Sequence, residues 1–160
     1  MAQPQTSAVF DCMVFLQAVI SETGAAAELF RYVESNAVRL FVSKEVLIEI
    51  RDVLTRPKVL LKYPHVTTES VDIFIGRIMV KAAFIKNPVT HFEYSRDPKD
   101  QKYINLAAEA KAGFLVSRDR DLLDLMTGAD IESKEFRQKF RSLKVVSPEE
   151  FLKIISALPI

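Results

Sequence analysis

The stretch from Arg96 to Leu125, RDPKDQKYINLAAEAKAGFLVSRDRDLLDL, contains the signals of a helix, a strand and a short helix in succession. Small and apolar residues recur at helical spacing over Gln101–Ala112, which predicts a helix closed by Gly113. The apolar run Phe114–Ser117 predicts a buried strand, and Asp121–Met126 predicts a short helix after it. The stretch therefore supplies one helix–strand–helix unit of an alternating α/β pattern.

The same alternation continues on both sides of this stretch. The further strands are predicted at Ala8–Phe10, Val38–Val42, Ala82–Ile85 and Lys144–Val146. The further helices are predicted at Ala25–Glu34, from the cap Ser43 to before Pro57, from Thr68 onward, and from the cap Ser147 onward. Five short strands between helices predict an α/β fold with a central, mainly parallel sheet and helices on both faces. We expect residues 1–7 to form a disordered tail and residues 8–160 a single domain.

Composition limits the classes of protein to which the chain can belong. Nearly half of the 160 residues are apolar, which predicts a packed globule, and the net charge of +1 gives no electrostatic case for or against nucleic acid. The single cysteine, Cys12, has no internal disulfide partner, which favours a reducing, cytoplasmic setting. No apolar run approaches the ~20 residues that a membrane span needs, and the polar N-terminus has no signal-peptide pattern.

Four acidic residues are placed where ligands bind in such sheets, beyond the carboxyl ends of the strands. Asp11 follows the first strand, Asp119 follows the strand that ends at Ser117, and Asp100 stands at the start of a helix. Glu49 lies roughly 100° from the centre of the apolar stripe of its helix, where its side chain can reach an edge cleft.

Carboxylates that converge on one cleft repel one another, so they either hold protons or recruit a cation. Oxygen ligands without histidine or cysteine suit Mg²⁺ or Mn²⁺ better than zinc. Such an ion activates water and stabilises the charge that develops during phosphodiester cleavage. We therefore expect a divalent-metal site of a kind that can support phosphodiester cleavage.

Each acid also has a purely structural interpretation. Asp100 and Asp119 are suitable helix N-caps, and Glu49 alone is an ordinary solvated helix charge. Asp11 is different because it follows a buried strand, and an unpaired buried carboxylate costs several kcal/mol. Cys12 as a nucleophile is disfavoured, since neither histidine stands at a triad spacing. No glycine-rich phosphate loop is present.

The sequence does not decide the role of two charged segments. The basic residues Arg51, Arg56 and Lys58 follow Glu49 and could hold an RNA backbone, although a solvated helix and loop is the default interpretation. The charged stretch Ile131–Leu143 is favoured as a solvated helix, and a contact with a partner or with RNA is the alternative.

Four segments of the chain resemble PIN domains, in the right order and over nearly the whole length. They are AVFDCMVFLQA (Ala8–Ala18), SKEVLIEIRDVLTRP (Ser43–Pro57), the stretch Arg96–Leu125 and VVSPEEFL (Val145–Leu152). The resemblance is greatest to the subgroup of toxin components of toxin–antitoxin pairs. It implies a three-layer α/β/α sandwich and a Mg²⁺- or Mn²⁺-dependent ribonuclease. It also implies a homodimer and a cognate antitoxin as partner.

The resemblance assigns roles to particular residues. Asp11, Glu49, Asp100 and Asp119 match the four acids of the family and are the implied metal-binding and catalytic set. Secondary candidates are Asp97, Asp121 and Ser117.

The chain departs from the family pattern directly after its first acid. Cys12 and Met13 stand where the family has Thr or Ser and then Asn. Methionine cannot replace the hydrogen bonds of that asparagine. A PIN fold without catalytic activity, binding RNA or a protein partner, is therefore the alternative function.

Overall fold

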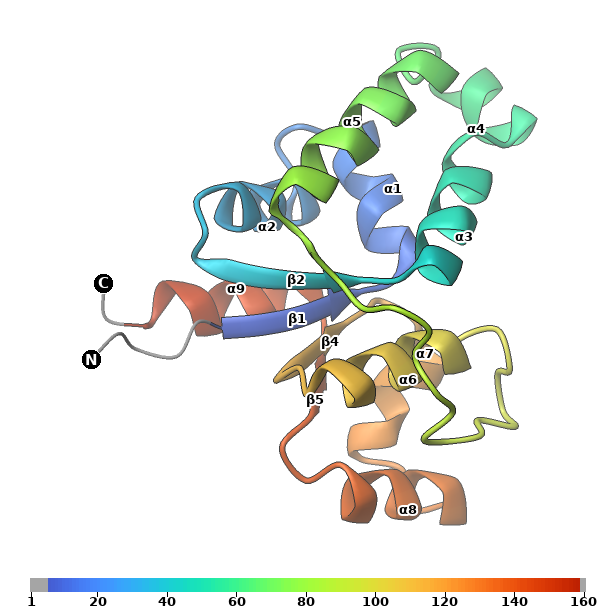
Figure 1. Cartoon of the computed structure of the whole chain (residues 1–160), viewed down its shortest axis with the longest axis vertical. Coiled ribbons are helices and arrows are strands. Elements are labelled where there is room, and N and C mark those ends of the chain that lie inside the picture. Colours follow the sequence, from blue (N-terminus) through green and yellow to red (C-terminus); the bar gives the residue numbers. More distant parts are fainter. Residues whose placement is uncertain (1–5, 159–160) are drawn as a thin grey trace.

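The computed structural model describes residues 6–158, which form an α/β structure around one parallel sheet (Figure 1). The strands lie in the order β3-β2-β1-β4-β5, and every neighbouring pair is parallel. Their bounds are β1 Thr6–Phe10, β2 Val38–Val42, β3 Ala83–Phe84, β4 Phe114–Val116 and β5 Lys144–Val146. The prediction of a mainly parallel sheet of about five strands is confirmed.

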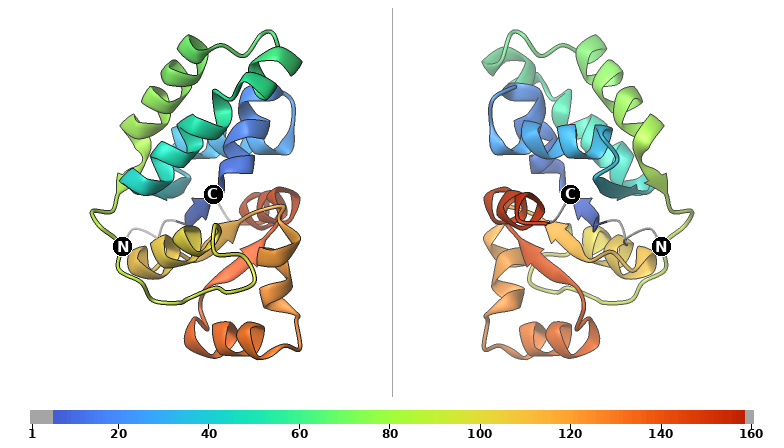
Figure 2. Two further views of the ribbon diagram at one scale, coloured as in Figure 1. Left: turned by 90° about the vertical axis from the view of Figure 1, so that its right-hand side faces the viewer. Right: turned by 90° about the vertical axis from the view of Figure 1, so that its left-hand side faces the viewer.

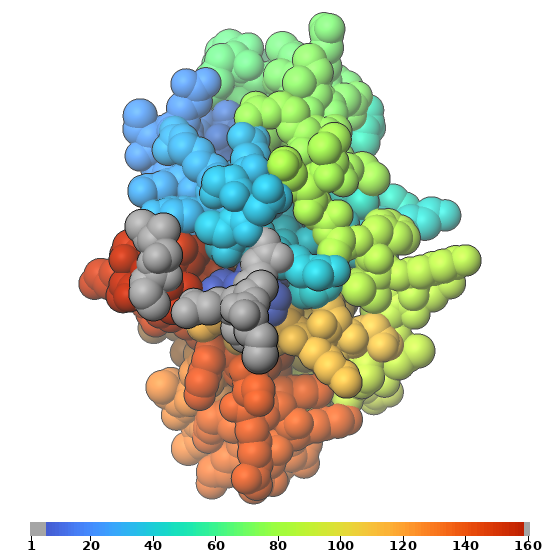
Figure 3. Space-filling view, turned by 60° about the vertical axis from the view of Figure 1, so that its left-hand side comes forward, coloured from blue at the N-terminus to red at the C-terminus, as the bar shows by residue number. Residues whose placement is uncertain are grey.

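Helices cover both faces of the sheet and give the predicted three layers (Figures 1 and 2). Helices α1, α2, α3 and α5 lie on one side in Figure 1, and α6 and α8 lie on the other. The helix bounds are α1 Cys12–Ile20, α2 Ala25–Glu34, α3 Lys44–Leu54, α4 Pro57–Lys62, α5 Thr68–Lys81, α6 Gln101–Ala110, α7 Arg120–Leu123, the 3₁₀ helix η1 Asp124–Met126, α8 Ile131–Lys139 and α9 Pro148–Ser156. Figure 3 shows α8 at one end of the molecule and the α4–α5 region at the other.

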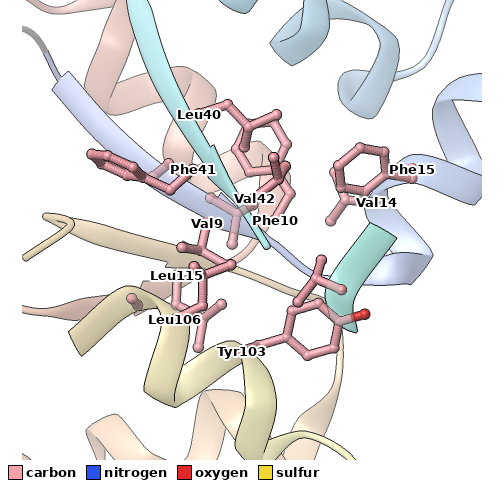
Figure 4. Close-up of a cluster of buried hydrophobic side chains, with 14 of the residues drawn as sticks. Val9, Phe10, Val14, Phe15, Leu40, Phe41, Val42, Tyr103, Leu106 and Leu115 are labelled. Atoms are coloured by element: carbon pink, nitrogen blue, oxygen red, sulfur yellow. The ribbon is translucent and has the colours of Figure 1, made fainter. Parts of the chain in front are cut away.

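The core lies on both faces of the central strand β1, whose residues Ala8, Val9 and Phe10 are all buried. This continuous apolar run is expected for a parallel strand that helices cover on both sides. Phe10 makes edge-to-face contacts with Phe15 (Figure 4) and with Phe30, so α1 and α2 pack on β1.

Pairing within the sheet aligns the carboxyl ends of β1 and β4. Phe10 pairs with Val116, and Val9 pairs with Leu115. The next residue along each strand, Asp11 or Ser117, therefore stands at the same edge of the sheet. This register is what brings together two site residues that are 106 positions apart.

The structure corrects two local predictions and assigns one further segment. Strand β1 begins at Thr6, so Thr6 and Ser7 belong to the sheet and not to the tail; the rest of the predicted tail, residues 1–5, lies outside the described residues. The apolar stretch after Asp11 forms helix α1, which the sequence left unassigned. Helix α5 runs to Lys81, so β3 is shorter than the predicted strand Ala82–Ile85.

The end of α6 is also different from the prediction. The left-handed residue after the helix is Lys111, with φ 53°, and not Gly113. The amide of Lys111 donates to the carbonyl of Ala108 and that of Ala112 to Ala107, which is the hydrogen-bond pattern of a Schellman turn. Gly113 already belongs to the approach to the sheet, where its amide donates to the Ser7 hydroxyl at 3.0 Å.

Among residues 6–158, no single helix has the length and apolar composition needed to cross a membrane. The bent pair α1 and α2 satisfies that test by length and composition only.

Candidate metal centre

The site is built on the aligned ends of β1 and β4. Asp11 is 3% exposed, and its Oδ1 caps α1 by accepting hydrogen bonds from the amides of Met13 and Val14 at 3.1 and 3.2 Å. The buried hydroxyl of Ser117 donates to the other oxygen of Asp11 and accepts from the amide of Asp119 at 2.9 Å. Ser117 therefore links the first and last of the predicted acids.

Three carboxylates meet beside this pair. Oxygens of Asp97, Asp100 and Asp119 all lie within 4.8 Å of one another. Asp97 and Asp100 come from the turn before α6, and Asp119 caps α7 by accepting from the amide of Asp121 at 2.8 Å. Among the described residues, the buried Oδ2 of Asp100 has no hydrogen-bond partner.

The electrostatics of the centre favour either protons or a cation. Burial, followed by the negative charges of Asp119 and Asp97, raises the pKa of Asp100 to about 8. Burial also raises the pKa of Asp11 to about 6, although the hydrogen bonds from Ser117 and the α1 amides oppose the shift. An unpartnered buried oxygen within a set of oxygen donors fits a hard divalent cation such as Mg²⁺ or Mn²⁺.

Glu49 is close to this centre but is engaged elsewhere. Its Oε2 forms an ion pair with the ammonium of Lys102, and its Oε1 accepts from the Tyr103 hydroxyl at 2.5 Å. Burial opposes ionisation of Glu49, but the hydrogen bonds from Lys102 and Tyr103 outweigh it and lower the pKa of Glu49. The three-acid cluster therefore forms without Glu49.

Cys12 lies against Glu49 and Tyr103 rather than in an activating environment. Burial, with the charges of Asp11 and Glu49, raises the pKa of its thiol to about 12. A thiol with such a pKa stays protonated at neutral pH, which agrees with the expectation that Cys12 is no nucleophile.

Asp121, a secondary candidate, is not part of the three-acid cluster. Its carboxylate pairs with Arg96 at 2.6 Å, and Arg96 also pairs with Asp124 at 3.0 Å. Asp97, the other secondary acid, is a member of the cluster.

The basic residues proposed for RNA lie on the exposed side of α3, directly before α4, and on α4. Arg51 follows Glu49 by two residues, which is about 200° around the helix, and pairs with the exposed Asp72 at 2.8 Å. Arg56 pairs with Asp52 at 3.2 Å, and Lys58 is exposed on α4.

Sequence reasoning missed Lys102, Tyr103 and Arg96. The sequence contains one indication that Lys102 is unusual. It stands in the first turn of a helix, where the helix dipole disfavours a positive charge. Tyr103 is buried among the core side chains that Figure 4 shows, and its hydroxyl donates to Glu49. The pairing of Arg96 depends on the tertiary position of α7 and had no sequence signal.

Comparison with known proteins supports the resemblance seen in the sequence. A family model described as PIN domain matches residues 7–121, which include the three clustered acids, Asp11 and Glu49. The chain belongs to the PIN-domain family. This PIN domain is also 31% identical over 144 residues to an uncharacterized protein of Methanocaldococcus jannaschii, covering 90% of this chain and 88% of that protein. No solved structure matches the chain. PIN domains are generally metal-dependent nucleases, and this PIN domain has an acidic cluster at the expected edge of its sheet.

Proposed function

We propose that this PIN domain is an endoribonuclease that depends on Mg²⁺ or Mn²⁺ and hydrolyses RNA phosphodiester bonds. The observation that supports this most strongly is the cluster of Asp97, Asp100 and Asp119, in which Asp100 has a buried oxygen without a partner. The position of the cluster beyond the ends of parallel strands is the usual place for a ligand in such folds.

Each residue of the centre has a distinct part in the proposal. Asp97, Asp100 and Asp119 would hold the ion, with Asp11 beside them as the fourth acid predicted from the sequence. A bound Mg²⁺ or Mn²⁺ would supply charge stabilisation and a more acidic water. Ser117 fixes the orientation of Asp11 and the backbone of Asp119 through its two hydrogen bonds. Asp11 and Asp119 are thereby held in place before the substrate arrives.

Cleavage of single-stranded and structured RNA with Mn²⁺ or Mg²⁺ tests this function. We expect Asp11→Asn and Asp119→Asn to lower the rate by at least about 100-fold, because the first removes a charge beside the ion and the second a charge that holds it. Addition of EDTA should abolish cleavage. Asp52→Asn, an exposed acid paired with Arg56, is the matched control and should cut as fast as wild type. If both site variants retain the wild-type rate, the assigned centre is wrong.

A PIN fold that binds RNA or a protein without cleaving is the second candidate function. Two observations favour it: Met13 stands where the family has asparagine, and Glu49 is neutralised by Lys102. RNA binding that persists in purified protein without metal-dependent turnover would support this candidate. Robust Mn²⁺-dependent turnover by clean protein would exclude it.

We also propose that the enzyme acts as the homodimeric toxin of a toxin–antitoxin pair. The support is the similarity of the four sequence segments to that subgroup. Growth arrest on expression, relieved by a small DNA-binding protein encoded next to it, would support this role. Normal growth together with the absence of such a neighbouring reading frame would count against it, and light scattering would test the dimer.

A further inference from the structure

Lys102 brings a nearly buried positive charge to the edge of the acidic centre. It lies in the first turn of α6, two residues after Asp100, and its side chain is 15% exposed. Its ammonium pairs with Glu49 and donates to the carbonyl of Lys99 at 2.7 Å. Lys99 itself lies between Asp97 and Asp100, so the ammonium adjoins the turn that supplies two of the three clustered acids.

Lys102 is unfavourable for its own helix. A positive charge in the first turn opposes the helix dipole, and a nearly buried ammonium loses much of its hydration. The ion pair with Glu49 and the hydrogen bond to the carbonyl of Lys99 offset these costs. The role of Lys102 is therefore to be sought in its contact with Glu49 rather than in the stability of α6.

The ion pair also determines which acids are available to a metal. One oxygen of Glu49 is bound by Lys102 and the other by the hydroxyl of Tyr103. The oxygens of Asp97, Asp100 and Asp119 face one another, and Oδ2 of Asp100 remains without a partner among the described residues. Among residues 6–158, the acids of this edge thus divide into Glu49, which pairs with Lys102, and the cluster of Asp97, Asp100 and Asp119, which forms no ion pair.

We propose that the ammonium of Lys102 takes the place of a second cation, so that the centre binds one divalent ion through Asp97, Asp100 and Asp119. In this arrangement Glu49 anchors Lys102 and is not a metal ligand. The inference rests on the proposed metal-dependent function and specifies how its site is built.

Lys102 then has a direct role toward the substrate. An ammonium has three N–H donors, and among the described residues two of them are used, one by Glu49 and one by the carbonyl of Lys99. The third N–H can bind a phosphate oxygen beside the metal-bound edge. The expected ligand is therefore a backbone phosphate of RNA, held between the divalent ion and Lys102.

The experiment is a titration of metal-free protein with Mn²⁺, followed by electron paramagnetic resonance and calorimetry. Wild type should bind one ion per chain, and Glu49→Gln should leave its affinity within about threefold, because only a partly screened charge is lost. Asp119→Asn should weaken binding by at least about 10-fold. Lys102→Met should bind a second ion, because Glu49 is then an uncompensated acid beside the cluster. The double variant Lys102→Met with Glu49→Gln should return to one ion.

Lys99→Met is the matched control, because Lys99 is an exposed lysine of the same turn, and its ion count should equal that of wild type. If Lys102→Met does not fold, Lys102→Gln replaces it. The titration of Glu49→Gln tests the inference even if neither lysine variant folds. Two ions in wild type, one of which disappears in Glu49→Gln, would overturn the inference, as would a folded Lys102 variant that still binds only one. No Mn²⁺ binding by wild type would instead reject the proposed metal centre, and this inference with it.

Discussion

At the residue scale, the site brings together carboxyl groups whose negative charge is unfavourable without a proton or a bound cation. Asp11 is buried and Asp100 is half-buried beside other carboxylates, and both pKa values lie above the ordinary 3.8. Hydrogen bonds from Ser117 and the α1 amides reduce the effect at Asp11. Asp100 has no such donor for its Oδ2 among the described residues, and its pKa is the higher of the two. Fewer hydrogen bonds offset the negative charge of Asp100 than that of Asp11. We therefore expect a bound cation to stabilise the fold more at Asp100.

These shifts predict how stability changes with pH when metal is absent. Between 3.8 and the raised values of about 6 and about 8, the folded protein binds more protons than the unfolded chain. The free energy of unfolding must then fall as pH rises through this window. We expect the Tm in EDTA to decrease from pH 5 to pH 8.5, and Mn²⁺ to raise it more at pH 8 than at pH 5, because metal and protons compete.

Asp100→Asn provides the comparison that isolates this effect. The variant lacks the carboxyl group with the highest raised pKa of the cluster, so its Tm should depend less on pH between 6 and 8.5. Asp72→Asn, an exposed acid paired with Arg51, should keep the wild-type slope. Equal slopes for Asp100→Asn and wild type would show that Asp100 does not titrate in this range.

At the element scale, α8 is more than a solvated helix. Its Phe136 is buried and packs on Phe92 and Phe140. Its Glu132 accepts hydrogen bonds from the amide and hydroxyl of Ser95 and from the amide of Arg96, at 2.9, 2.7 and 3.3 Å. The predicted solvated face exists, but the helix also fixes the segment that leads directly into Asp97.

This contact predicts that Glu132 affects the metal centre without touching it. Glu132→Ala removes the three acceptor contacts and lets the turn before α6 move. We expect the affinity for Mn²⁺ to fall by roughly 10-fold, as for other residues that orient ligands, with only a small change in Tm. Glu135→Ala, at an exposed position of the same helix, should leave the affinity unchanged. Equal affinities in the two variants would argue that the turn is fixed by other contacts.

The end of α6 makes a prediction about stability alone. Lys111 holds a left-handed conformation, with φ 53°, that disfavours a residue with a Cβ atom. Lys111→Gly should therefore increase the free energy of unfolding by roughly 0.5–1 kcal/mol, since glycine adopts this region freely. Chemical denaturation measures the change. Lys111→Ala keeps the Cβ and should give no gain; an equal gain in both variants would point to the lost charge instead.

At the scale of the whole molecule, a parallel sheet explains why the site is assembled from distant segments. The order β3-β2-β1-β4-β5 places β1 and β4 side by side, with Asp11 and Ser117 at the same edge. Helices α6 and α7 then contribute Asp97, Asp100 and Asp119 from the turns that precede them. The fold thus concentrates acids from three turns in one place, which none of these elements could do alone.

The sequence by itself determined the alternation of strands and helices, because apolar periodicity and capping residues are local signals. It also indicated Asp11, Asp100 and Asp119 as acids near strand ends, and the clustering of Asp100 with Asp119 is observed. Family membership followed from the order of the motifs, which the comparison confirms.

Only the tertiary structure decided how the acids are divided. Asp97 entered the cluster, while Glu49 was bound by Lys102 and Tyr103, which lie 53 and 54 positions away in the sequence. Helix phase can say that Glu49 is near an edge, but it cannot say which side chain from another helix meets it there. Ion pairs depend on distances of a few ångströms between elements, and those distances exist only after the helices pack on the sheet.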